Sequence, residues 1–269
     1  MHYVQGSSKN KIAVYELNPK GKKTILFIHG WPLNHKIYEY QVNILPDLGF
    51  RTVSIDLRGF GNSDVTASGY EYEELAKDVH KVIQSLGVKN LILVGFSMGA
   101  AICIKYMNLF NEYKVSKLAL LGAAAPSFIK RPDYPFGISE KEINSIIRQC
   151  YHDRPKTVAD FGEKLFATNV SDEMRLWFKN INFSSSGIAT IETAKSLRNE
   201  DLRNDLSNIK VPTGIFHGKK DEICPYPFAE VLHDGIKNSK LYVFENSGHA
   251  LFIDELEKFN REFISFISH

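Results

Sequence analysis

Several features that mark other protein classes are scarce or missing in this chain of 269 residues. It has three scattered cysteines, too few and too irregularly spaced for a disulfide framework or a cysteine-rich metal site. No apolar run approaches the about 18 residues of a membrane-spanning helix, and the N-terminal residues lack the apolar segment of a signal peptide. Lysine and arginine number 33 against 31 acidic residues, so no charge excess favours nucleic acid or an anionic membrane. We therefore expect a cytoplasmic protein.

What the sequence does contain is an alternation of short apolar runs and amphipathic patterns. Residues 24–29, 52–56 and 91–95 are short runs rich in aliphatic or β-branched residues, which is typical of strands buried on both faces of a parallel sheet. Residues 75–86 place apolar side chains at helical spacing, and Gly87 follows where a C-terminal cap belongs. The alternation predicts an α/β fold with a mostly parallel sheet flanked by helices.

One long segment breaks this alternation. Residues 125–205 contain no convincing strand but four apolar patterns with helical spacing. We interpret the segment as a helical cap inserted into a core formed by residues 1–124 and 206–269. We expect the cap to line a mostly apolar substrate pocket with aromatic side chains, namely Phe161, Phe166 and Trp177.

The stretch "LILVGFSMGAA" holds the candidate nucleophile. Ser97 lies in a G-x-S-x-G pattern between an apolar strand and a run compatible with a helix. A serine on such a sharp turn has a strained backbone, and the residues two positions away are forced close to it. A Cβ at Gly95 or Gly99 would therefore collide with its neighbours. The turn would point the hydroxyl out of the sheet at a helix N-terminus, where backbone N–H groups stabilise an oxyanion. The alternative is an ordinary glycine-rich turn.

A nucleophilic serine needs a base and an acid that orients the base. His249 lies in a loop between a strand and the terminal helix, and Asp221 lies in the loop after an earlier strand. The order Ser97, Asp221, His249 is the one expected for a hydrolase with a strand-turn-helix nucleophile. Glu222 is the rival for the acid, whereas we assign Asp254 to the first turn of the terminal helix.

Two further loops complete the predicted site. The loop "HGWP" follows an early strand, and we expect its Trp31 N–H to join the Met98 N–H in an oxyanion hole. Residues 56–63 follow the next strand, and we interpret them as structural support for that loop. His29 and His217 each close a strand before a glycine, so we expect both to form structural hydrogen bonds.

Together, "HGWP", "DLRGFGNSD", "GFSMG", "HGKKDEICP" and "SGHA" resemble the α/β-hydrolase superfamily. The branch they resemble most is that of the cofactor-free bacterial haloperoxidases and aryl esterases. The resemblance covers nearly the whole chain and is weakest in the cap. It implies that Ser97 is the nucleophile, Asp221 the orienting acid and His249 the base, with Trp31 and Met98 as backbone donors and no cofactor or metal.

This resemblance favours a serine hydrolase that acts on a small carboxylic ester through an acyl-enzyme. Pro32 matches the haloperoxidases, so peroxide could replace water and give a peracid. Serine at the elbow disfavours the dehalogenases and epoxide hydrolases, whose nucleophile is an aspartate. Two alternatives stay open: a ligand-binding signalling protein that retains the triad, and a carbon–carbon bond hydrolase or lactonase of the same fold. The expected partner is a small ester or carboxylic acid.

Overall fold

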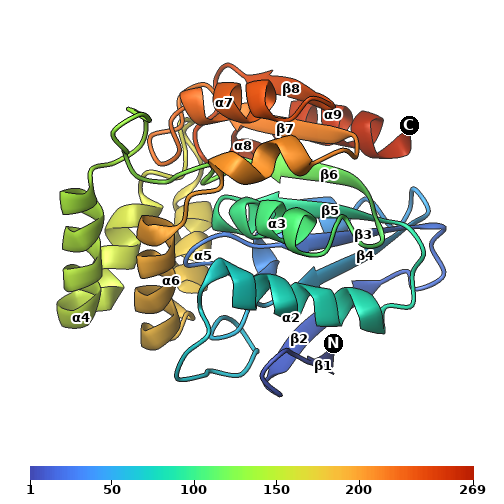
Figure 1. The fold of residues 1–269 in the computed structure, drawn as a ribbon, viewed down its shortest axis with the longest axis horizontal. Helices are drawn as coiled ribbons and strands as arrows, with labels where there is room; N and C mark the ends of the chain where they lie inside the picture. Colours follow the sequence, from blue (N-terminus) through green and yellow to red (C-terminus); the bar gives the residue numbers. More distant parts are fainter.

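The computed structural model describes all 269 residues and is built on one eight-stranded sheet (Figure 1). The strand order is β1-β2-β4-β3-β5-β6-β7-β8; β2 pairs antiparallel with both β1 and β4, and every other pair is parallel. This confirms the mostly parallel sheet. The strands are β1 His2–Gln5, β2 Lys11–Leu17, β3 Lys23–Ile28, β4 Phe50–Ile55, β5 Leu91–Phe96, β6 Val115–Leu121, β7 Thr213–Gly218 and β8 Ser239–Phe244.

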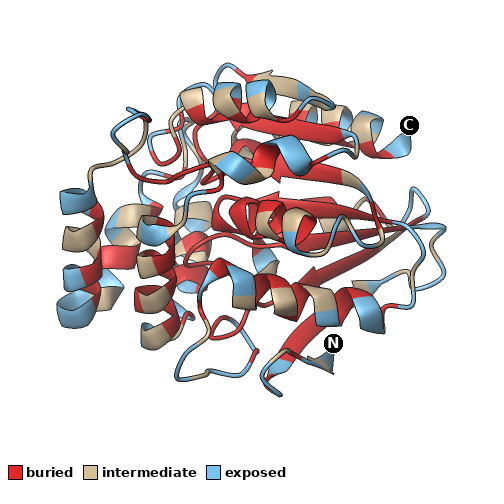
Figure 2. Cartoon of the chain, in the orientation of Figure 1, coloured by how far each residue is buried: buried red, intermediate tan, exposed pale blue.

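Helices cover the sheet because its central strands are apolar on both faces. Every residue of β5 and β7 is buried, and Figure 2 shows the middle of the sheet as the most buried part of the molecule. No helix is both long and apolar enough to cross a membrane. The helical elements are η1 His35–Tyr38, α1 Glu39–Val42, α2 Tyr72–Ser85, α3 Met98–Leu109, α4 Glu140–Gly162, α5 Asp172–Phe183, α6 Gly187–Asn199, η2 Arg203–Asn208, α7 Pro227–Gly235, α8 Leu251–Asp254 and α9 Leu256–Ser268.

Helices α4, α5 and α6 lie between β6 and β7 in the sequence and contribute no strand to the sheet. Figure 1 shows them grouped beyond one end of the strands, on the left of the view. The helix α4 is kinked at Asp153, just before Pro155. The spacing of Phe161, Leu165 and Phe166 predicts one further helical face, which is wrong in part, because α4 ends at Gly162 and Leu165 and Phe166 lie beyond the helix.

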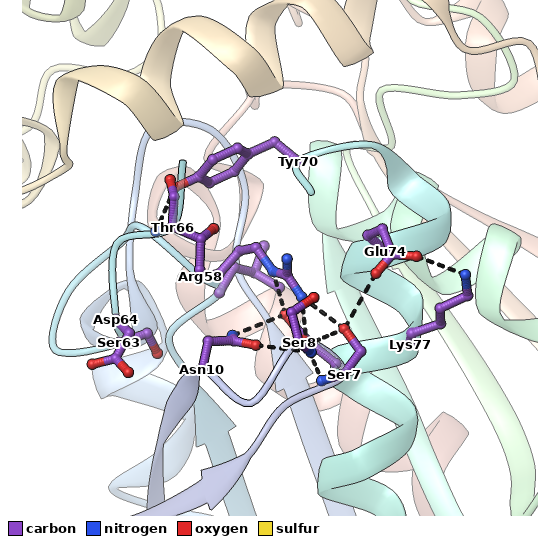
Figure 3. A network of polar contacts seen from close by, with 12 residues as sticks. Ser7, Ser8, Asn10, Arg58, Ser63, Asp64, Thr66, Tyr70, Glu74 and Lys77 are labelled. Carbon is purple, nitrogen blue, oxygen red and sulfur yellow. Dashed lines mark hydrogen bonds and ion pairs between the residues drawn. The ribbon is translucent and has the colours of Figure 1, made fainter. Parts of the chain in front are cut away.

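A buried ion pair holds the N-terminal hairpin against the rest of the fold (Figure 3). Arg58 Nε lies 2.6 Å from Asp78 Oδ2, and the two side chains are 1% and 0% exposed. Arg58 Nη2 donates to Asp78 Oδ1 at 2.8 Å and to Ser7 Oγ at 2.7 Å. The Ser7 backbone N–H also donates to Asp78 Oδ1, at 2.8 Å. The pair therefore joins the β1–β2 turn, the loop after β4 and helix α2.

Candidate active site

Ser97 occupies the turn between β5 and α3 with φ 54° and ψ −120°. A positive φ is strained for a residue with a Cβ, so the surroundings must hold the turn in place. The Ser97 N–H donates to the Leu121 carbonyl at 2.9 Å, and its carbonyl accepts from the N–H of Ala100 at 3.0 Å and of Ala124 at 3.1 Å. The backbone of neighbouring segments therefore fixes the strained residue.

The glycines around Ser97 are required by close backbone approach. A Cβ on Gly95 would lie 2.5 Å from the Gly99 carbonyl oxygen, and one on Gly99 would lie 2.3 Å from the Ile28 carbonyl oxygen. A third glycine was not singled out from the sequence: a Cβ on Gly30 would lie 2.8 Å from Ser97 Cβ. Gly30 therefore brings the loop after β3 directly against the serine.

Asp221 and His249 form a buried hydrogen-bonded pair at the carboxyl ends of neighbouring strands β7 and β8. His249 Nδ1 lies 2.7 Å from Asp221 Oδ2. Asp221 Oδ1 accepts from the backbone N–H groups of Ile223 and Cys224, both at 2.8 Å, so the carboxylate is fixed in rotation. The rival acid, Glu222, is exposed.

The second ring nitrogen of His249, Nε2, is the atom that would take a proton from a serine nucleophile. His249 is 1% exposed, and its Nε2 is buried with no hydrogen-bond partner. The imidazole packs against the Phe96 ring, with 4.7 Å between centroids, and so lies beside the residue that precedes Ser97. With Nδ1–H donated to a carboxylate, Nε2 is left as a proton acceptor. A buried acceptor without a partner, packed against the residue that precedes the strained Ser97, is what a general base needs before its substrate binds.

Two other buried histidines are structural, as expected. His29 Nε2 accepts the Leu57 N–H at 3.0 Å, and burial lowers the pKa of His29 to about 4, so the ring is neutral. This bond joins residues 56–63 to the end of β3. His217 Nε2 donates to the Cys224 carbonyl at 2.7 Å, and burial lowers its pKa too.

Cys224 is the one nucleophilic side chain near Ser97 that sequence reasoning did not consider. It is fully buried in the Asp221 loop. Burial raises the pKa of its thiol well above the usual value and Asp221 raises it further, while the Ser97 hydroxyl lowers it. The thiol therefore stays protonated at neutral pH and does not compete as a nucleophile. No three His, Cys, Asp or Glu side chains converge as metal ligands.

The predicted oxyanion donors are Met98, which follows Ser97, and Trp31, which follows the glycine that contacts it. Met98 begins α3, so its N–H is one of the first-turn donors that have no acceptor within the helix. The Trp31 N–H donates to no protein atom, although Trp31 is buried. Its indole Nε1 donates to the Thr190 carbonyl of α6 at 2.9 Å, and its ring meets the Phe161 ring of α4 edge-on, with 4.8 Å between centroids. The loop after β3 is thus tied to α6 and α4, two of the helices between β6 and β7.

The predicted pocket residues do not all lie together. Pro32 is buried beside Trp31, and Phe161 contacts the Trp31 ring. Phe166 and Trp177 both pack edge-on against Phe178. Trp177 also lines a surface cavity of about 440 Å³ with residues of β2, η1 and α1, and it packs half-buried against the core.

The sequence matches a known protein family over most of its length. A family model described as the alpha/beta hydrolase fold matches residues 23–256. The chain belongs to the α/β-hydrolase family. An α/β-hydrolase from Bacillus subtilis (strain 168), the AB hydrolase superfamily protein YisY, is 48% identical over 259 residues, which cover 96% of each chain.

Two solved α/β-hydrolase structures match over almost their whole length. An esterase from Exiguobacterium antarcticum is 43% identical with a TM-score of 0.97, covering 99% of each chain. A bromoperoxidase from Bacillus anthracis is 29% identical with a TM-score of 0.95, covering 100% of this chain and 99% of that one. The resemblance inferred from the motifs is therefore confirmed, and this α/β-hydrolase is an enzyme of the esterase and non-heme haloperoxidase type.

Proposed function

We propose that this α/β-hydrolase cleaves small carboxylic esters with Ser97 as nucleophile, His249 as general base and Asp221 as the acid that orients the base. The observation that carries the proposal is the unpartnered, buried Nε2 of His249, whose ring is held by the bond from Nδ1 to Asp221 and packs against Phe96, the residue before the strained Ser97. We propose further that residues 125–205 act as the cap that shapes the pocket, with Phe161 against the oxyanion loop.

In the first half-reaction, His249 Nε2 takes the Ser97 proton as Oγ attacks the ester carbonyl carbon. The Asp221 carboxylate stabilises the imidazolium, while the Trp31 and Met98 N–H groups donate to the carbonyl oxygen as it gains negative charge. The oxyanion collapses, His249 protonates the departing alkoxide, and the alcohol leaves behind an ester between the acyl group and Ser97. A water deprotonated by His249 then attacks this acyl-enzyme and releases the acid.

Pro32 supports a second activity of the same site, in which hydrogen peroxide attacks the acyl-enzyme in place of water. Proline has a fixed φ and restricts the residue before it, so it limits how the Trp31 carbonyl can turn. That carbonyl would lie beside the acyl group if the Trp31 N–H points into the oxyanion hole. It can then accept a hydrogen bond from an incoming hydroperoxide. The product would be a peracid.

The deciding experiment measures turnover and labelling of the wild type and of Ser97→Ala. The wild type should turn over p-nitrophenyl acetate many times, and mass spectrometry after fluorophosphonate treatment should find the adduct on Ser97 alone. Ser97→Ala should lose on the order of 10⁶ in kcat. A single burst without turnover would instead favour a ligand-binding protein, and labelling at another residue would refute the assignment.

A further inference from the structure

Asp254, at the end of α8, gathers hydrogen bonds from two segments that are far apart in sequence. Its Oδ2 accepts from the N–H groups of Gly248 at 2.7 Å and Ala167 at 2.9 Å. Its Oδ1 accepts from the Thr168 N–H at 3.1 Å and from the Thr168 hydroxyl at 2.5 Å. One partner immediately precedes His249, whereas the other two residues belong to the segment between α4 and α5.

The same two segments also touch through their backbones. The Ala250 N–H donates to the Leu165 carbonyl at 2.8 Å. A Cβ on Gly248 would lie 2.9 Å from the Ala167 nitrogen. Both neighbours of His249 in the sequence are therefore linked to residues 165–168. Ala250 is bonded to Leu165 directly, and Gly248 is linked through Asp254.

We propose that Asp254 is a positioning residue that holds the His249 loop and residues 165–168 as one unit. The inference rests on the proposed role of His249 as the base. An ionised carboxylate suits this place because all four of its partners are donors and it only accepts. Loss of the carboxylate would free Gly248 and let the imidazole leave the geometry needed to take the serine proton, at a cost in kcat.

Asp254→Asn tests this directly, since an amide turns at least one N–H toward groups that are themselves donors. We expect kcat for p-nitrophenyl acetate to fall tenfold or more while KM changes less than threefold. Hydrogen exchange should become faster in residues 246–250 and 165–168 but not in β5. Thr168→Val, which keeps the Gly248 bond, should retain kcat within threefold, and the exposed Glu257→Gln serves as the matched control with wild-type kcat.

Failure of the proposed catalytic function and failure of the proposed role of Asp254 give different results. If Ser97→Ala remained active, the proposed nucleophile would be wrong whatever Asp254 does. If Ser97→Ala is inactive but Asp254→Asn keeps kcat within twofold of wild type, Asp254 has no positioning role. Should Asp254→Asn not fold, Asp254→Glu replaces it. In that variant, the protection of residues 246–250 from hydrogen exchange and the kcat must either both fall or both stay at the wild-type value. A wild-type kcat with lost protection, or faster exchange spread through β5, would overturn the proposal.

Discussion

Replacing Asp221 with asparagine should inactivate the enzyme while leaving its fold intact, and the structure explains why. Two backbone N–H groups, from Ile223 and Cys224, donate to Asp221 Oδ1. In Asp221→Asn the carbonyl oxygen of the amide must take that position, because an NH₂ group there would face two donors. The amide NH₂ then replaces Oδ2 and points at His249 Nδ1, 2.7 Å away in the wild type.

The consequence is the wrong tautomer of the base. His249 Nδ1 would have to accept from the amide, so the ring proton would move to Nε2, which could no longer take the proton of Ser97. A loss of roughly 10⁴ in kcat is the size expected for this change in a serine triad, equivalent to about 5.5 kcal/mol of transition-state stabilisation. Single-turnover and steady-state hydrolysis of p-nitrophenyl acetate at pH 7.5 would measure it, with far-UV circular dichroism to confirm folding.

The neighbouring carboxylate provides the control. Glu222 is exposed and next to Asp221 in sequence, so Glu222→Gln should keep wild-type kcat. An Asp221→Asn enzyme within tenfold of wild type would show that the carboxylate does not set the tautomer. An inactive Glu222→Gln enzyme would move the acid to the rival residue.

Three further predictions concern the oxyanion loop and the stability of the fold. Pro32→Leu should lower the ratio of peracid formation, from acetate and peroxide, to p-nitrophenyl acetate hydrolysis by at least tenfold, about 1.4 kcal/mol; an unchanged ratio means that Pro32 only shapes the loop. Arg58→Leu leaves the Asp78 carboxylate buried without its cation and should lower the free energy of unfolding in urea by about 3–5 kcal/mol, whereas Lys156→Leu, at an exposed pair, should cost less than about 1 kcal/mol. Burial lowers the pKa of His29 to about 4 against about 6.5 in the unfolded chain, so stability should be lost as pH falls from about 6.5 to 4, by about 3 kcal/mol. His29→Gln should show a flatter pH dependence of urea unfolding over that interval, and an identical slope in both proteins would contradict this assignment.

The sheet was predictable because buried parallel strands have a strong local signature. The runs that form β3 and β5 are mostly apolar on both faces, which is typical of strands covered on both sides. Single-turn elements such as α1 and α8 were not predicted, since four residues are too few to show a repeating helical pattern of apolar side chains. The end of α4 at Gly162 was not predicted either, because residues with helical apolar spacing continue in the sequence after the backbone has left the helix.

The candidate triad was predictable for a different reason, which is the order of its residues after strands. Parallel strands bring their carboxyl ends to one edge, so the loops after β5, β7 and β8 must meet. The tertiary hydrogen bonds of Asp254 had no such signal. Its partners in residues 165–168 precede it by more than eighty positions and donate mainly backbone N–H groups, which every sequence has. The position of Trp177 likewise depended on the orientation of α5, which helical spacing alone does not determine.

The residues between β6 and β7 are hydrogen-bonded to some parts of the proposed site and not to others. Ser97 and His249 are 4% and 1% exposed, so both proposed catalytic residues are almost fully buried. Trp31 Nε1 is bonded to α6, and the loop that carries His249 is bonded to residues 165–168. The backbone bonds of Ser97, by contrast, go to Leu121, Ala100 and Ala124, all outside the cap helices. The segment between β6 and β7 is therefore bonded to the loops of the proposed oxyanion donor and the proposed base, but not to the backbone of the proposed nucleophile.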